Sequence, residues 1–248
     1  MTLEKKPLIS IITVSLNSDQ TIQRTIDSVK NQTYKNIEYI VIDGKSTDNT
    51  INIIKQNEKH ITKWFSETDN GIYDAFNKGL KVYSGDYVGF LNSDDYLNPN
   101  AISILVRYIN NYPEKDFFFG SVKKHWGILH GFKPWKIFFT WNFYTSHSTG
   151  FFIKKDAAKK IGEYNLKYKF SADYDYFYRM IVKHKMKGVA TKRKEIFGTF
   201  RQGGFSSKIN FYDHMCESTK IRIDNGQNKI VVLFTFLYKY LCNLKRIK

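Results

Sequence analysis

A regular alternation of buried strands and one-sided helices in the first 110 residues constrains the fold more than any other feature. Residues 8–16 and 37–44 are continuous aliphatic runs rich in β-branched side chains, which is typical of strands covered on both faces. Residues 21–32, which lie between them, instead repeat apolar side chains at helical spacing. The same order continues with a helix over 46–57, a strand over 61–67, a helix over 71–83, a strand over 86–92 and a helix that begins near Asn98 and Pro99.

Strands that alternate with helices through short connections form βαβ units. The sequence therefore predicts an α/β fold with a mostly parallel sheet, flanking helices and right-handed crossovers. In open sheets of this kind, ligands bind beyond the carboxyl ends of the strands. Polar side chains follow the expected strand ends at four places: Asn17, Asp43, the pair Glu67 and Asp69, and the pair Asp94 and Asp95. We expect this polar edge to carry the functional site.

The 248-residue chain, with a hydrophobic fraction of 42%, is large enough for one α/β domain with a small appendage. We divide it into an α/β half (residues 1–110), a second half of the same domain (111–225) and a basic C-terminal helix (226–248). The formal net charge of +16 is concentrated after residue 110, whereas the first half is close to neutral. A basic second half favours an anionic partner, either a polyanion or a membrane leaflet, unless it only reflects a genome that favours Lys and Asn.

The sequence lacks the signals of several other protein classes. Its two cysteines, Cys216 and Cys242, form no CxxC pair, so neither a disulfide framework nor a zinc site is indicated, and a reducing cytoplasm fits best. The apolar run PLISIITVSL ends at Asn17 without a cleavage pattern, and no run reaches the ~18–20 apolar residues that span a bilayer. Neither a P-loop nor a GxGxxG motif is present, so bound phosphate would need a metal ion and basic side chains.

The second half predicts further elements with less regular spacing. We expect a strand over 117–126, a strand running into a helix over 149–162, a helix over 171–185, a strand with a glycine-rich loop over 194–207, and an aliphatic and aromatic helix over 229–248. No clean period is visible over 131–144.

The stretch FLNSDD, residues 90–95, is the strongest candidate for chemistry. Two adjacent carboxylates disfavour each other's ionisation unless a positive charge lies near them. The next helix is expected only from Asn98, which leaves Asp94 and Asp95 on the rim of the sheet. Hard carboxylate oxygens suit Mg²⁺ or Mn²⁺, which bind few protein carboxylates together with substrate phosphates. The alternative is that the two aspartates only cap that helix.

Four residues of the second half are further candidates. Arg201 in FRQGG can hold phosphate charge, and the glycines after it let backbone N–H groups approach an anion; the alternative is an ordinary surface charge. Asp173 and Asp175 point to different faces of one helix, so one can face a cleft as a general base while the other caps the helix. His147 is either an acid, base or anion contact, or a structural histidine.

Taken in order, these segments resemble family 2 glycosyltransferases with the GT-A fold, and among them the bacterial enzymes that build O-antigen or capsular polysaccharide. The resemblance runs from residue 7 to about residue 207 and is carried by ISIITVSLNSDQ, VIDGKSTDNT, SETDNGIYDAFNKGL, SGDYVGFLNSDD, SHSTGFFIKK, SADYDYFYRM and FRQGGFSS. The QxxRW motif of processive members is absent, so transfer of a single sugar is expected.

The resemblance implies a nucleotide-sugar donor, usually a UDP-sugar, a divalent cation (Mn²⁺ or Mg²⁺) and inversion at the anomeric carbon. The first half would bind the donor, and the second half would bind the acceptor and carry the base. Asp94 matches the metal ligand and Asp173 the general base, whereas Asn92 replaces a frequent Asp and Ala172 the usual Glu. The residues assigned to the donor are Thr13, Ser15, Asn17, Asp43, Asp69, Asn77, Lys78, Asn92, Ser93, Asp94, Asp95 and Arg201, and His147 is assigned to the acceptor or the diphosphate.

Acceptors in such pathways are commonly lipid-linked glycans at the inner leaflet, which would explain a basic and aromatic second half. The helix over 229–248 has an apolar stretch of ~13 residues, suited to lying in the membrane interface rather than spanning it. Its Lys239, Lys245, Arg246 and Lys248 would then meet anionic head groups. We expect a cytoplasmic enzyme held peripherally at the membrane. The alternative is that this helix packs on its own domain or at a homodimer contact.

Two rival functions follow from the same residues. A nucleic-acid-binding protein would use the basic second half, but no recognition motif is present and rim carboxylates would repel phosphates, so we expect no nucleic-acid partner. A non-catalytic sugar-nucleotide-binding module would keep the donor residues without transfer, and an assay of nucleotide release separates it from an enzyme.

Overall fold

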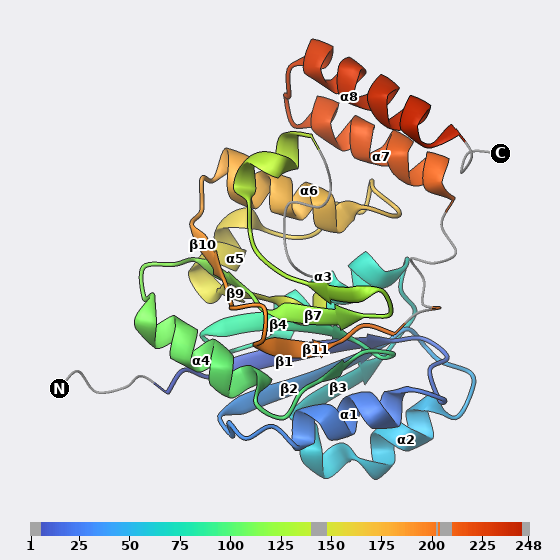
Figure 1. The fold of residues 1–248 in the computed structure, drawn as a ribbon. Helices are drawn as coiled ribbons and strands as arrows, with labels where there is room; N and C mark the ends of the chain where they lie inside the picture. The colour runs from blue at the N-terminus through green and yellow to red at the C-terminus, as the bar shows by residue number, and fades with distance from the viewer. Residues whose placement is uncertain (1–5, 140–147, 202, 204–209, 245–248) are drawn as a thin grey trace.

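A seven-stranded sheet runs through the molecule, for which a computed structural model describes residues 6–139, 148–201, 203 and 210–244 (Figure 1). The strand order is β10-β6-β9-β4-β1-β2-β3. All neighbours are parallel except β9, which runs antiparallel to β4 and β6. The strands are β1 (Ile9–Ser15), β2 (Ile37–Asp43), β3 (Lys63–Ser66), β4 (Tyr87–Asn92), β6 (Phe117–Phe119), β9 (Phe151–Lys154) and β10 (Gly188–Ala190). The mostly parallel α/β sheet predicted from the sequence is confirmed.

Helices cover both faces of this sheet, which therefore has two hydrophobic cores. In β1, Ile12 and Val14 belong to one core and Ile9 and Ile11 to the other, because successive side chains of a strand point to opposite faces. Helices α3, α5 and α6 line the first core, and α1, α2 and α4 line the second. The helices are α1 (Ile22–Lys30), α2 (Thr50–Gln56), α3 (Ile72–Val82), α4 (Ala101–Asn111), α5 (Lys155–Ile161), α6 (Ala172–Tyr178), α7 (Phe211–Asp224) and α8 (Lys229–Cys242). Because helices cover both faces of the sheet, its strands are apolar at successive positions, which explains the continuous apolar runs of the first half.

A second sheet, which the strand patterns did not predict, joins the two halves of the chain. Its order is β5-β11-β7-β8, where β5 spans Tyr96–Leu97, β7 Ser121–Lys124, β8 Gly127–Leu129 and β11 Ile196–Thr199. β11 runs antiparallel to β5 and parallel to β7. The single strand expected over 117–126 is therefore split between two sheets, as β6 and β7. This sheet brings the segment after β11 to the residues that follow β4.

Helix α7 is the one long element of the described chain that the sequence analysis missed. Its sequence, FYDHMCESTKIRID, mixes charged and apolar side chains without a clear apolar stripe. Its start does carry a local signal, because the Asn210 side chain accepts a hydrogen bond from the Tyr212 N–H. The helix predicted over 171–185 forms, but it winds as a π-helix over Arg179–Lys183.

The predicted C-terminal helix is confirmed as α8, which packs against α7 beyond α6 (Figure 1). One side of α8 is solvent-exposed and apolar. Its large side chains, with Leu244 two residues beyond the helix, are 45–70% exposed, and we call them the apolar face of α8: Ile230, Leu233, Phe234, Leu237, Tyr238, Leu241 and Leu244. No helix within the described residues has the length and apolar character needed to cross a bilayer.

Lys239 does not take the place that the sequence predicted for it. Its Nζ is buried rather than exposed beside the apolar face of α8. Burial, together with the nearby positive charge of Arg222 on α7, lowers the pKa of Lys239 to about 7. The expectation that Lys239 meets anionic head groups is therefore wrong, and Lys245, Arg246 and Lys248 lie outside the described residues.

Candidate functional site

Asp95 holds the candidate site together. Its side chain is 1% exposed. Its Oδ2 accepts a hydrogen bond from the Thr149 hydroxyl (2.8 Å), and its Oδ1 accepts one from the Arg201 N–H (3.0 Å). The carboxylate thus ties the segment after β4 to the 3-10 turn Ser148–Gly150, which precedes β9, and to the segment after β11. The expectation that both aspartates lie open on the rim is therefore wrong for Asp95, whose buried carboxylate binds other parts of the protein.

Asn92, Ser93 and Asp94 form the tip between β4 and β5. Asp94 is partly exposed, whereas Ser93 is buried with its hydroxyl 2.8 Å from the Ser18 hydroxyl. The Asn92 Oδ1 is buried and has no hydrogen-bond partner among the described residues. A buried carbonyl oxygen without a donor is costly, so it suits a ligand that supplies positive charge. The two aspartates do not cap α4, because β5 separates the tip from that helix and Asn100 occupies its N-cap position.

A hydrogen-bond network surrounds Asp43 at the carboxyl ends of β1 and β2. This fully buried carboxylate accepts hydrogen bonds from the hydroxyls of Ser15 (3.0 Å), Ser46 (2.5 Å) and Ser66 (2.8 Å), and from the Ser46 N–H. Asn17 has a positive φ of 47° and donates its N–H to the Ser46 hydroxyl (2.8 Å). The side chains predicted to surround the nucleotide are therefore brought together.

Three of the donor-site predictions on β1 and β2 concern buried side chains, namely Thr13, Ser15 and Asp43. Thr13 is fully buried, where the Tyr39 hydroxyl donates to it (3.2 Å). All three are at most 5% exposed and therefore lie beneath the surface of the rim. Their contact with the nucleotide stays a prediction.

The segment between β3 and α3 lies over the end of β2. A Cβ atom on Gly44 would lie 2.5 Å from the Asp69 Oδ2, so the Asp69 carboxylate packs directly on the Gly44 backbone. The Asp69 Oδ1 accepts the N–H of Gly71, whose φ of +106° suits glycine. Lys78 holds the same segment through the Thr68 carbonyl (2.6 Å) and an ion pair with Glu67 (3.2 Å).

Asn77 lies away from this rim. It is 1% exposed, its Nδ2 donates to the Tyr164 carbonyl (2.9 Å), and its Oδ1 accepts the Tyr164 N–H (2.7 Å). Both ends of the amide therefore bind one backbone unit of the loop after α5. We assign Asn77 to positioning that loop rather than to contact with the donor, which corrects the sequence-based assignment.

Asp173 lies in the first turn of helix α6 and contacts Tyr73 of α3. Its Oδ1 accepts hydrogen bonds from the Tyr73 hydroxyl (3.2 Å) and from the Tyr174 N–H (2.8 Å). The Tyr73 hydroxyl also contacts the Phe170 carbonyl (3.0 Å). Because its side chain is only partly buried, Asp173 is the acidic residue of α6 that can reach a bound molecule.

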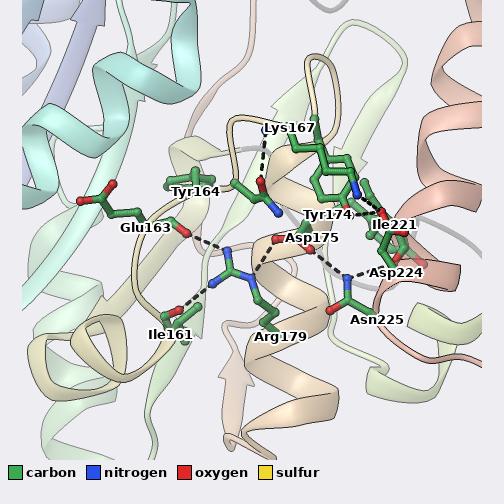
Figure 2. Close-up of polar contacts among 12 residues, drawn as sticks. Ile161, Glu163, Tyr164, Lys167, Tyr174, Asp175, Arg179, Ile221, Asp224 and Asn225 are labelled. Carbon is green, nitrogen blue, oxygen red and sulfur yellow. Dashed lines mark hydrogen bonds and ion pairs between the residues drawn. The ribbon is translucent and has the colours of Figure 1, made fainter.

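Asp175 has a different role from the cap that the sequence suggested. Its buried carboxylate pairs with Arg179 (2.8 Å) and accepts a hydrogen bond from Asn225 (2.8 Å) (Figure 2). Arg179 in turn donates to the carbonyls of Ile161 (2.6 Å) and Glu163 (2.8 Å). The network joins α6 to the end of α5 and to the end of α7, and so fixes the helix that carries Asp173.

Helix α7 also holds the loop before α6, which sequence reasoning missed. The Glu217 carboxylate accepts the N–H groups of Lys169 (2.6 Å) and Phe170 (2.7 Å). No local pattern marks Glu217, since its partners lie more than 40 residues earlier in the chain. Arg201 is exposed, as a phosphate contact requires, and His147 lies outside the described residues.

A mostly parallel sheet with helices on both faces, and with carboxylates at the carboxyl ends of its strands, defines the class of open-sheet α/β proteins, in which that edge is the usual ligand-binding edge. The model of the family described as glycosyl transferase family 2 matches residues 10–177. The chain therefore belongs to glycosyl transferase family 2, and it is a glycosyltransferase.

Relatives of known sequence agree with this membership. An uncharacterized glycosyltransferase of Mycobacterium tuberculosis is 33% identical over 187 residues, which cover 70% of this chain and 68% of that protein. The UDP-Glc:alpha-D-GlcNAc-diphosphoundecaprenol beta-1,3-glucosyltransferase WfaP of Escherichia coli is 40% identical over 121 residues, 44% of this chain and 48% of its own length.

The fold recurs in a solved structure with little sequence identity. The mannosyltransferase PcManGT from Pyrobaculum calidifontis, in complex with GDP-Man and Mn²⁺, superposes with a TM-score of 0.70 at 14% identity. The alignment covers 98% of this chain and 72% of that one. The expected GT-A fold is thereby confirmed.

Proposed function

We propose that this glycosyltransferase moves one sugar, with inversion, from a nucleotide-sugar to a glycan acceptor carried on a lipid. The observation that carries the proposal is a chain of contacts from the donor segment to the predicted base. Asp69 accepts the Gly71 N–H at the start of α3, and Tyr73, two residues further on, donates to Asp173. Asp173 thus lies beside the segment assigned to the donor.

Asp173 is the general base of the proposed reaction. The Tyr73 hydroxyl and the Tyr174 N–H fix the orientation of its carboxylate before the substrates bind. As the acceptor hydroxyl attacks the anomeric carbon, Asp173 takes its proton, and assistance of this kind is worth ~10²–10⁴ in rate. Attack from the side opposite the departing diphosphate inverts the configuration at that carbon.

The residues at the tip after β4 fit a divalent cation. Asp94 offers a carboxylate, and the buried Asn92 Oδ1 offers an oxygen that lacks a donor. A cation there would be held by few protein ligands together with substrate phosphates. When bound there, Mn²⁺ or Mg²⁺ would stabilise negative charge on the departing diphosphate.

A screen of UDP- and GDP-sugars tests the proposed activity. We expect Mn²⁺-dependent release of nucleoside diphosphate from a UDP-sugar, because the name of the E. coli relative includes UDP-Glc; GDP-Man belongs in the panel because the solved mannosyltransferase binds it. Release is measured with and without glycan acceptors. Nucleotide binding without release would favour the non-catalytic module, and salt-sensitive retention of RNA or DNA without nucleotide binding would favour the nucleic-acid rival.

The apolar face of α8 supports an acceptor at an anionic membrane surface. The sequence over 229–248 contains basic residues and no acidic residue, so an anionic leaflet complements it better than a second copy of the same helix. Exposed aliphatic and aromatic side chains along one helix side suit shallow insertion between head groups. Peripheral attachment at the inner leaflet would place the site where lipid-linked acceptors lie.

Vesicle flotation tests this surface with a pair of leucines. We expect Leu237→Gln with Leu241→Gln to lower the fraction bound to phosphatidylglycerol vesicles by at least about fivefold, since each loses apolar area that the membrane would cover. Leu166→Gln is the control, because Leu166 is similarly exposed (50%) but lies outside α8. Equal flotation of the double variant and the native chain would defeat the membrane proposal, and loss of a dimer in light scattering would favour self-association.

A further inference from the structure

Lys124 is a half-buried cation at the rim that sequence reasoning did not single out. It ends β7, which runs parallel to β11, so the two strands deliver their last residues to the same edge. The Phe200 N–H donates to the Lys123 carbonyl (2.9 Å), which continues the pairing past the end of β11. Lys124 is therefore held beside the segment that leads into Arg201.

The Lys124 ammonium is packed against the ring of Phe200. Its Nζ lies 4.4 Å from the centroid of the Phe200 ring, a cation–π contact. No Asp or Glu in the described part of the chain forms an ion pair with it. Burial lowers the pKa of Lys124, and the negative charge of Asp95 opposes that shift. Asp95 itself is already bonded to Thr149 and to the Arg201 backbone.

We propose that Lys124 binds the diphosphate of the nucleotide-sugar donor, on the same rim as Arg201 and Asp94. The inference rests on the proposed function and adds a protein cation to its phosphate site. A partly desolvated ammonium that forms no ion pair with the described acidic residues is unfavourable, and an arriving anion reduces that penalty. Charge-assisted hydrogen bonds to phosphate oxygens are also about twice as strong as neutral ones. Lys124 thus favours the diphosphate over the nucleoside part of the ligand.

Calorimetric titration of matched variants with UDP, GDP and uridine tests the assignment, in buffers with Mn²⁺ and with EDTA. We expect Lys124→Met to weaken binding of the nucleoside diphosphate by at least about tenfold in both buffers and to leave uridine affinity unchanged. Lys124→Arg should recover most of the loss, because it restores the charge. Lys123→Met is the control: Lys123 precedes Lys124 but is exposed on the other face of the strand, and its loss should change neither affinity.

The outcomes separate this inference from the proposed function. If the native chain binds neither UDP nor GDP, the proposed function fails and the role of Lys124 fails with it. If the native chain binds one of them and Lys124→Met binds it equally well, only the role of Lys124 is overturned. Parallel losses for uridine, or for Lys123→Met, would indicate a general disturbance of the rim and would also overturn it. Lys124→Gln serves as a second variant if the Met variant does not fold.

Discussion

Replacing Asp173 with asparagine is expected to lower sugar transfer by about 10³-fold while donor binding and folding stay intact. Asparagine has nearly the same shape and can still accept hydrogen bonds from Tyr73 and from the Tyr174 N–H. It cannot take the acceptor's proton, and general-base assistance is worth ~10²–10⁴. Nucleotide release at saturating acceptor measures the rate, and calorimetry with the donor measures binding.

Asp175 supplies the matched control on the same helix. Asp175→Asn leaves Arg179 without its carboxylate in a buried network, which should lower the free energy of unfolding by about 3 kcal/mol in a urea titration. The rate per folded molecule should fall far less than for Asp173→Asn. Turnover of Asp173→Asn near that of the native chain would remove Asp173 from the base role.

The second large effect is expected at Asp94. Asp94→Asn should weaken Mn²⁺-dependent binding of the nucleoside diphosphate by about 100-fold, since Asp95 is committed to Thr149 and Arg201 and Asp94 is the other carboxylate of the tip. A cation on a phosphoryl oxygen is worth several kcal/mol, and a neutral amide holds it poorly. Titration with UDP in Mn²⁺ and in EDTA measures the metal-dependent part.

Asp95→Asn distinguishes loss of the cation from damage to the tip. Its buried carboxylate accepts two hydrogen bonds, so an amide there should lower stability while the ratio of affinities with and without Mn²⁺ stays close to native. An unchanged titration for Asp94→Asn, or identical behaviour of the two variants, would contradict the assignment of Asp94 to the metal.

Much of the central fold follows from local sequence. The aliphatic runs over 8–16 and 37–44 became β1 and β2 within one or two residues, because a strand covered on both faces needs apolar side chains at every position. The helix expected to end at residue 162 was equally predictable, because glycine commonly ends a helix, and Gly162 takes a φ of +82° at the end of α5. The helices and strands that were predicted are those whose own residues show an apolar pattern or an end signal.

Short strands and polar helices carry no such pattern. β5 has two residues and β8 three, which is too few to show a period. The sequence patterns therefore did not predict the second sheet. Helix α7 is stabilised through tertiary contacts such as those of Glu217, and its own sequence has no clear apolar stripe.

The sequence by itself determined the parallel sheet, the polar edge at its carboxyl ends and the set of residues able to act there. Tertiary structure decided their roles. Asp94 and Asp95 are neighbours of identical chemistry, but Asp95 is drawn inward by Thr149, 54 residues away, and by Arg201, 106 residues away. Asn77 is likewise engaged by Tyr164, 87 residues away. Local patterns report which side chains are available, whereas the partners that bury or expose them come from distant parts of the chain.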